Sequence, residues 1–439
     1  MILFFIFLLL GLIFIGLYIF SRERFSPANL LLALWLAAMG IAQLQLSPYE
    51  RAWPLNFWFL LFIFLAIFYL VYKIVSYKFG QKLAVTEISP AIQLKYPLII
   101  FTVLTLITLV ANFYIFNRFG TLPILSSVPD KLRFIINREV FGLWEYAALL
   151  PRLYLPFIFI CLLIAKNLPL TKRLWLWFNL VLGFLFLGLY ASRLVIILPI
   201  LLSYFAYLYL KIKELNFKKI IISSLTALLL VAFIAVTIPA LRNYITYQDY
   251  YSEIDYTPFT YLADLSSINL PANLSWLIPL YLIPSFNLQA LMRAVDFYNL
   301  NNYYFGAYSL SAFDSLLNIF SLPGLGIVIP WETIFLPWWV TATFLFSSFV
   351  DFGYLGIILA AVGWGVILAL IYQLATKKPT LLSVMLMSYL SFVVVMSIYT
   401  DYLLREEFYL DLIFIFLISL AVNSYSKNLP TILLPKRKS

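Results

Sequence analysis

Arginine is the residue of this sequence best suited to chemistry, because it is concentrated in alternate connectors between long apolar segments. Those connectors and the adjoining segment ends contain one lysine, Lys131, and nine arginines: Arg51, Arg118, Arg133, Arg138, Arg152, Arg193, Arg242, Arg293 and Arg405. The other connectors contain 15 lysines and only 4 arginines. A guanidinium is always charged and offers a planar fork that matches phosphate and carboxylate oxygens. We therefore expect an arginine-lined site for phosphate or pyrophosphate on one side of the protein.

Two of these arginines have sequence positions that restrict where they lie. Arg193 stands between two apolar segments with almost no loop, so we expect it at the rim of a helix bundle. Arg152 comes seven residues after Glu145, which places both residues on one helical face. Ionisable residues at that depth are functional candidates by default. The alternative is structural: the arginines pair with acids or reach lipid headgroups, and Arg152 pairs with Glu145 through water.

Several kinds of catalysis are excluded or disfavoured by composition. The sequence has no histidine, and Cys161 is its single cysteine, so histidine bases, histidine metal ligands and intramolecular disulfides are excluded. The acids Asp249, Glu253 and Asp255 have a spacing that suits Mg²⁺ or Mn²⁺ beside a sugar phosphate. We expect a solvated acidic face there, and we expect neither a metal nor another cofactor.

The elements that must position these residues are membrane helices. Apolar residues make up 64% of the chain and charged residues 11%, far from the composition of soluble domains. Apolar runs long enough to cross a bilayer fall at 2–20, 28–46, 55–76, 97–117, 143–165, 174–191, 194–210, 220–240, 352–374, 380–400 and 409–425. We expect an all-α polytopic membrane protein of about 11 transmembrane helices, in one domain from 1 to 439. The first run lacks a signal-peptide cleavage site, and we expect it to be retained.

The charges of the connectors predict an orientation. Connectors of one parity hold 19 cations and 3 acids, and those of the other parity hold 10 cations and 16 acids. By the positive-inside rule the first set is cytoplasmic, so we expect the N-terminus outside and the C-terminus inside. The net charge of +10 therefore reflects topology and does not indicate a nucleic-acid partner.

The longest connector, 241–351, is predicted to form a large external segment. Its apolar stretches at 274–290, 313–330 and 333–350 are broken by proline and glycine. Such stretches suit interfacial or re-entrant helices, because unpaired backbone at membrane depth must be buried in protein or face water. If two of them cross the membrane, the total rises from 11 to 13 helices.

Three short stretches have residues at characteristic spacings. They are Gly120, Pro123, Asp130 and Arg133 after one span, the turn Ala191, Ser192, Arg193, and the helix entry Asp351, Phe352, Gly353, Gly356. They resemble the Gly-x-x-Pro, Gly-Ser-Arg-Gly and Asp-Phe-Gly-x-x-Gly segments of the bacterial oligosaccharide repeat-unit polymerases, the Wzy-type O-antigen polymerase family. In the second stretch Ala191 and Leu194 stand in place of the glycines.

The resemblance implies a GT-C-like membrane glycosyltransferase. Such an enzyme transfers a growing glycan from undecaprenyl pyrophosphate to the next undecaprenyl-pyrophosphate-linked repeat unit, on the periplasmic face of the bacterial inner membrane. The implied partners are this lipid-linked oligosaccharide, membrane lipid and a chain-length regulator, with no nucleic acid. Two alternatives stay open. One is an O-antigen ligase-like or other lipid-sugar transferase, and the lack of histidine counts against ligases that rely on one. The other is a flippase or transporter for the same lipid-linked oligosaccharide.

For such a transfer, arginines at the departing pyrophosphate should supply the largest stabilisation of the transition state. The predicted catalytic residues are Arg193, Arg293 and Arg405, with Glu145 and Asp314 as candidate proton acceptors. The predicted substrate-binding residues are Arg152, Arg133, Arg242, Tyr303 and Tyr304. We expect Asp351 to cap the helix that it precedes, since a carboxylate suits a helix N-terminus.

Overall fold

The protein is built from helices. The structure, a computed structural model, describes residues 2–21, 23–83, 95–126, 132, 143–164, 168–190, 192–212, 214–251, 258–298, 303–313, 331–336, 339 and 341–424. Within these ranges there is no β-strand, and an isolated bridge joins Leu336 to Trp339. The predicted all-α class is confirmed for this part of the chain.

The helices follow the predicted apolar runs closely. In chain order they are α1 (Ile2–Phe20), α2 (Pro27–Ala42), α3 (Leu55–Lys82), α4 (Lys95–Phe119), η1 (Pro123–Leu125), α6 (Leu143–Leu149), α7 (Pro151–Ile164), α8 (Leu170–Leu189), α9 (Arg193–Lys211), α10 (Phe217–Tyr251), α11 (Pro258–Ser266), η2 (Ala272–Leu277), α12 (Ile278–Phe297), α13 (Ala307–Leu310), η3 (Ser311–Phe313), α15 (Trp331–Ile334), α16 (Phe346–Lys377), α17 (Leu381–Met396), η4 (Tyr402–Leu404) and α18 (Glu406–Ser424). Most of each predicted run is helical.

The chain is a multi-pass membrane protein. Within the described residues, nine helical stretches are long and apolar enough to cross a membrane, and α2 and α17 are shorter apolar helices. Large apolar side chains on several of these helices are exposed on the outside of the bundle, for example Leu9 at 61%, Phe113 at 64% and Phe233 at 64%. Contiguous exposed apolar surface of this kind marks contact with lipid.

Small residues and buried polar side chains hold the bundle together. A side chain at Gly11 would approach the carbonyl oxygen of Ala33 to 3.2 Å, so α1 and α2 pack with their backbones close. Between distant segments, the Trp35 indole donates to Ser397 at 2.9 Å and Ser26 donates to Tyr72 at 3.1 Å. Both devices are typical of helix association in lipid, where the hydrophobic effect does not draw helices together.

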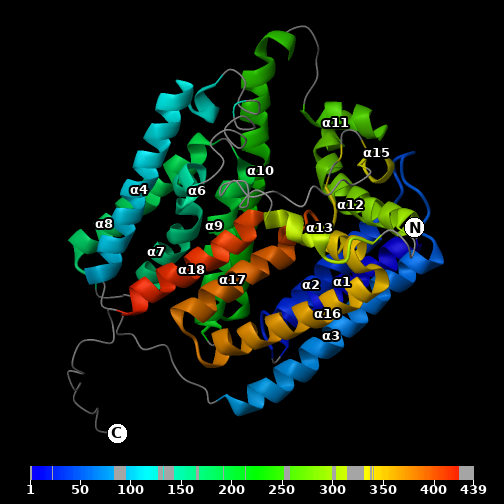
Figure 1. Cartoon of the computed structure of the whole chain (residues 1–439), viewed down its shortest axis with the longest axis horizontal. Helices are drawn as coiled ribbons and strands as arrows, with labels where there is room; N and C mark the ends of the chain where they lie inside the picture. Colours follow the sequence, from blue (N-terminus) through cyan, green and yellow to red (C-terminus); the bar gives the residue numbers. More distant parts are fainter. Residues whose placement is uncertain are drawn as a thin grey trace.

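α10 is longer than predicted. Its span was expected to end at residue 240, but the helix continues to Tyr251 and has 35 residues. At 1.5 Å per residue it is about 52 Å long, well beyond the roughly 30 Å of a hydrocarbon core. In Figure 1 its C-terminal end projects past the other helices.

α12 lies against connectors at several points along its length. The Tyr281 hydroxyl accepts a hydrogen bond from the backbone of Leu46 at 2.7 Å, and the Arg293 side chain donates to the carbonyl of Tyr49 at 2.9 Å. Asn287, between them, donates to the carbonyl of Ile398 at 2.7 Å. Residues near both ends of α12 therefore contact the same short connector between α2 and α3. Figure 1 shows α12 beside α11 and α15.

A break in α16 organises the end of the long connector. Gly353 has φ +58° and ψ −138°, outside the helical region, so the helix kinks there. Asp351 just before the kink accepts hydrogen bonds from the backbone N–H groups of Tyr308 and Ser309, both at 2.9 Å. Asp351 is thus a helix cap, but it caps α13 and not α16, which corrects our expectation. The kink turns its carboxylate toward the neighbouring helix.

Candidate functional site

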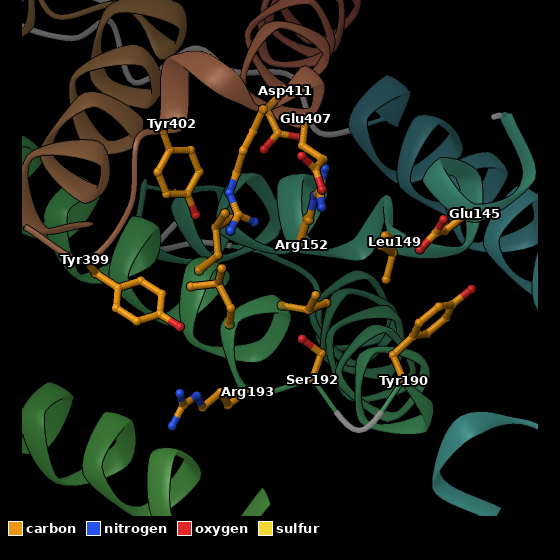
Figure 2. Close-up of a pocket in the computed structure, with 14 residues that line it drawn as sticks. Glu145, Leu149, Arg152, Tyr190, Ser192, Arg193, Tyr399, Tyr402, Glu407 and Asp411 are labelled. Atoms are coloured by element: carbon orange, nitrogen blue, oxygen red, sulfur yellow. The ribbon is translucent and has the colours of Figure 1, made fainter. Parts of the chain in front are cut away.

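A cavity of about 320 Å³ lies where three separate parts of the chain meet. Its walls come from α6 and α7, from the turn between α8 and α9, and from α18 with the connector that precedes it (Figure 2). The lining residues are Glu145, Leu149, Arg152, Tyr190, Ser192, Arg193, Leu194, Val195, Leu198, Tyr399, Tyr402, Arg405, Glu407 and Asp411. Four of the predicted site residues are among them: Glu145, Arg152, Arg193 and Arg405.

Arg152 and Asp411 form a buried ion pair in the cavity wall. The Arg152 Nη2 lies 2.8 Å from the Asp411 Oδ1, and the two side chains are only 7% and 2% exposed. The hydroxyls of Tyr146 and Tyr389 also donate to Asp411, the latter at 3.1 Å. Removing two charges from water costs several kcal/mol each, and close pairing with additional hydrogen bonds offsets that cost. The pair therefore holds the Arg152 guanidinium in one position.

This ion pair gives Arg152 an acidic partner, as the structural alternative expects. We had named Glu145 as its possible partner, whereas the direct partner is Asp411 on α18. The guanidinium carbon also lies 4.9 Å from the centroid of the Tyr146 ring, which adds a cation–π contact. Its Nε atom is buried and has no hydrogen-bond partner among the described residues. Arg152 is anchored on one side and keeps one donor unsatisfied.

Arg193 and Arg405 are held less tightly. Arg193 is the first residue of α9 and its side chain is exposed, while the Arg405 guanidinium carbon lies 5.7 Å from the centroid of the Tyr402 ring. Within the described part of the chain, neither has a carboxylate oxygen within 4.0 Å. Ser192 gives α9 no side-chain cap, so no capping side chain occupies the first backbone N–H groups of this 19-residue helix, and helix N-termini of this kind suit anions.

Carboxylates and tyrosines complete the walls. Figure 2 shows Arg193 and Tyr399 on one side of the cavity and Glu145 and Tyr190 on the other. The Tyr190 side chain is 1% exposed, and its hydroxyl has no hydrogen-bond partner among the described residues. A tyrosine hydroxyl is protonated at neutral pH. It can donate to a ligand.

Other predicted residues lie elsewhere. Arg293 is on α12, lines a separate small cavity and donates to the carbonyl of Tyr49, so the structure does not bring it to Arg193 and Arg405. Tyr303 packs on the kink of α16, where a side chain at Gly353 would lie 2.5 Å from its ring. The backbone N–H of Tyr304 donates to the carbonyl of Val350 at 3.3 Å. Neither tyrosine lines the arginine cavity, because Tyr303 contacts Gly353 and Tyr304 is bonded to Val350, both on α16.

Some predictions fall outside the described residues. Arg133 and Asp314 are among these, and Arg242 lies on α10 at a position whose side chain is not described. The acids Glu253 and Asp255 lie outside as well, and the side chain of Asp249 is not described. Within the described residues, no group of three or more cysteines or acids is placed to hold a metal ion. The expectation of a metal-free site remains a prediction.

Sequence reasoning missed Asp411 and the tyrosines of the cavity. Asp411 is the single acid of the predicted run 409–425, and the depth argument applied to Arg152 would also have selected it. Tyr190, Tyr399 and Tyr402 carry no such signal, because tyrosine is common at membrane interfaces.

Comparison with known proteins adds no further assignment: no protein-family model, no curated protein and no solved structure matches this chain.

Proposed function

We propose that this protein is a glycosyltransferase with a polyprenyl pyrophosphate-linked donor, and that it polymerises lipid-linked oligosaccharide repeat units at the periplasmic face of the bacterial inner membrane. The observation that carries the proposal is the convergence of Arg152, Arg193 and Arg405 in one cavity. These arginines come from three different parts of the chain, and a cavity with several guanidinium groups suits the oxygens of a pyrophosphate.

The reaction requires groups for two opposite charges. The acceptor hydroxyl attacks the anomeric carbon, the bond from that carbon to the pyrophosphate oxygen breaks, and the electron pair leaves with the pyrophosphate. The acceptor proton goes to a carboxylate. The cavity offers Arg193 and Arg405 to the leaving group and Glu145 and Glu407 to the proton. A cavity lined by both cations and carboxylates fits this division of roles.

Arg152 is a third cation for the leaving group in this proposal, and it is held in place in advance. Asp411 and Tyr146 fix its guanidinium, so little reorganisation is needed when negative charge develops on the leaving group. The hydroxyl of Tyr190 and the rings of Tyr399 and Tyr402 suit sugar hydroxyls and sugar faces. The lining residues Leu194, Val195 and Leu198 are apolar and suit the polyprenyl chain where it meets the pyrophosphate.

The finer topology belongs to the same proposal. We infer that the eleven predicted runs cross the membrane and that α12 lies at the outer interface. Its contacts with Leu46 and Tyr49 near opposite ends support this orientation, although its composition alone also permits a span. The N-terminus is then periplasmic and the C-terminus cytoplasmic.

The test is chain growth from a purified lipid-linked repeat unit by the purified protein. Wild-type protein should produce a ladder of lipid-linked glycans. Arg193→Lys keeps the charge but loses the fork, and a charge-assisted hydrogen bond of this type contributes about 1.5 to 3 kcal/mol, so the rate should fall roughly ten- to a hundred-fold.

The matched control is Arg118→Lys, the same substitution at an exposed arginine outside the cavity. It should leave the ladder unchanged. A full ladder from well-folded Arg193→Lys would remove the pyrophosphate role of that residue. Movement of the repeat unit across vesicle membranes without chain growth would instead favour the transporter.

A further inference from the structure

A second pair of arginines, Arg51 and Arg293, lies where α12 rests on the connector between α2 and α3. The Arg293 side chain donates from Nη2 to the carbonyl of Tyr49 at 2.9 Å, and Tyr49 is two residues before Arg51. Neither arginine of this pair lines the arginine cavity. The pair is therefore a separate concentration of positive charge that the proposed transfer reaction does not use.

Gln289 fixes the backbone of Arg51 against α12. Its side-chain Nε2 donates to the carbonyl of Arg51 at 2.8 Å, and its Oε1 accepts from the backbone N–H of Arg51 at 3.2 Å. Gln289 is only 2% exposed and lies on α12 one turn before Arg293. One helix therefore carries Arg293 and also holds the backbone from which the exposed side chain of Arg51 extends.

No acid compensates the two charges. The positive charge of Arg51 repels that of Arg293. Over the residues that the structure describes, no carboxylate oxygen lies within 4.0 Å of either guanidinium group. The neighbouring acid Glu50 is used elsewhere, because its Oε2 accepts from the backbone of Ser47 at 3.0 Å and from the Tyr281 hydroxyl. The fold thus holds two like charges together at a cost that a bound anion would offset.

The two guanidinium groups keep enough donors for several oxygens of one ligand. Each guanidinium has five N–H donors. Arg293 uses Nη2 on the carbonyl of Tyr49, and its Nε has no hydrogen-bond partner among the described residues. Asp296, one turn after Arg293 on α12, is exposed and forms no ion pair with it in the described part of the chain. The planar forks that remain match the oxygens of a phosphate.

An exposed apolar stripe begins next to Arg51 in the sequence. Leu55, the first residue of α3, is 84% exposed, and Phe59 and Phe62 are 62% and 47% exposed. Their spacing of four and then three residues places them on one face of the helix. Leu55 comes four residues after Arg51. A cationic pair at the start of such a helix suits a ligand with both a phosphate and an apolar chain.

We propose that Arg51 and Arg293 bind the terminal phosphate of a membrane lipid, a phosphate monoester whose apolar chain lies along Leu55, Phe59 and Phe62. A phosphate monoester carries a charge of about −1.5 to −2 at neutral pH. That charge matches two guanidinium groups, whereas a phosphodiester carries a single negative charge. Phosphatidic acid and polyprenyl phosphates both present this chemistry. The proposal does not depend on the glycosyltransferase assignment.

The test is native mass spectrometry of the full-length, delipidated protein titrated with phosphatidic acid. Arg51→Gln should weaken the tightest binding step on the order of tenfold, since it removes a charge-assisted contact. Arg293→Gln should do the same, and the exposed Arg51 keeps the test valid if that variant does not fold. The matched control is Arg118→Gln, which removes an exposed arginine from the last turn of another membrane helix, α4, and should leave the tight step unchanged.

Further arms separate a site for a lipid phosphate monoester from general attraction to headgroups. With the same acyl chains, phosphatidylglycerol should bind more weakly than phosphatidic acid, and phosphatidylcholine more weakly still. Undecaprenyl phosphate should compete for the same step, and the tighter of the two monoesters identifies the source. Equal loss of binding in Arg118→Gln, or equal binding of phosphatidic acid and phosphatidylglycerol, would overturn the proposal. Competition by inorganic phosphate at equal concentration would overturn the role of the apolar chain.

Discussion

The buried ion pair between Arg152 and Asp411 gives the most direct test of the cavity. The experiment is a double-mutant cycle with Arg152→Gln, Asp411→Asn and the double variant. Each single substitution leaves one charge at a position that is nearly inaccessible to water, because the side chains are 7% and 2% exposed. The double variant removes both charges and keeps polar groups of similar size.

The expected magnitudes follow from burial. Breaking a buried pair by removing one partner costs about 3 to 5 kcal/mol, because the remaining charge is uncompensated. Asp411→Asn also disturbs the hydrogen bonds from Tyr146 and Tyr389, each of which contributes about 1 kcal/mol. The double variant should therefore be at least as stable as either single variant. The coupling energy should reach the upper part of the roughly 0.5 to 3 kcal/mol range found for residues in contact, or exceed it.

Denaturant-induced unfolding in detergent micelles, followed by tryptophan fluorescence, measures the cycle. If the single variants each cost less than about 1 kcal/mol and the double variant is their sum, the pair is solvated and our account of the cavity wall is wrong. The chain-growth assay adds a second measurement. The double variant should fold and yet form little polymer, because Arg152 is then absent from the leaving-group site.

Three further predictions concern pH, metal and topology. Burial raises the pKa of Asp401 to about 7 from its usual 3.8. The protonated carboxyl therefore stabilises the folded state by at most about 4 kcal/mol. This stabilisation is fully present below the usual pKa and is lost as the pH rises to about 7. The melting temperature should therefore fall between pH 4 and pH 7, and Asp401→Asn should flatten that slope; equal slopes would exclude Asp401 as the cause. Chain growth should persist in EDTA, and loss of activity that Mg²⁺ or Mn²⁺ restores would show that a metal is required. In a Cys161→Ser background, an impermeant thiol reagent should label Tyr250→Cys in intact cells and Lys378→Cys only after lysis; the reverse pattern would invert the topology.

The membrane helices were predictable because their signal is long and local. A run of about 20 apolar residues has few structural alternatives, and most of each predicted run is helical. The end of α10 was not predictable from hydropathy. Residues 241–251 are polar enough to leave the membrane, yet they contain no glycine or proline that would stop the helix. Hydropathy indicates where a span ends, and the helix itself ends for other reasons.

The candidate site was predictable only in part. Depth and sidedness selected Arg152, Arg193 and Arg405, which come together in the cavity although they are far apart in the sequence. The same criteria also selected Arg293, whose position depends on how α12 rests on the connector between α2 and α3. No periodicity in the sequence reports that contact. The partner of Arg152 was missed because Asp411 lies 259 residues away in the sequence, on α18.

The helix entry from Asp351 to Gly356 explains why the proposed function rests on the arginine cavity and not on that motif. Gly353 needs a positive φ, and any side chain at Gly356 would overlap the carbonyl oxygen of Ser348. Asp351 is used to cap α13. Asp351, Gly353 and Gly356, three of the four residues of the motif that resembles the polymerase family, thus have a local structural reason. Two unrelated chains with the same kinked helix would be driven to the same three residues. Arg193 and Arg405 have no such reason, because in the described part of the chain neither pairs with a carboxylate. Two guanidinium groups kept in one cavity without an acidic partner are better explained by an anionic ligand than by the fold.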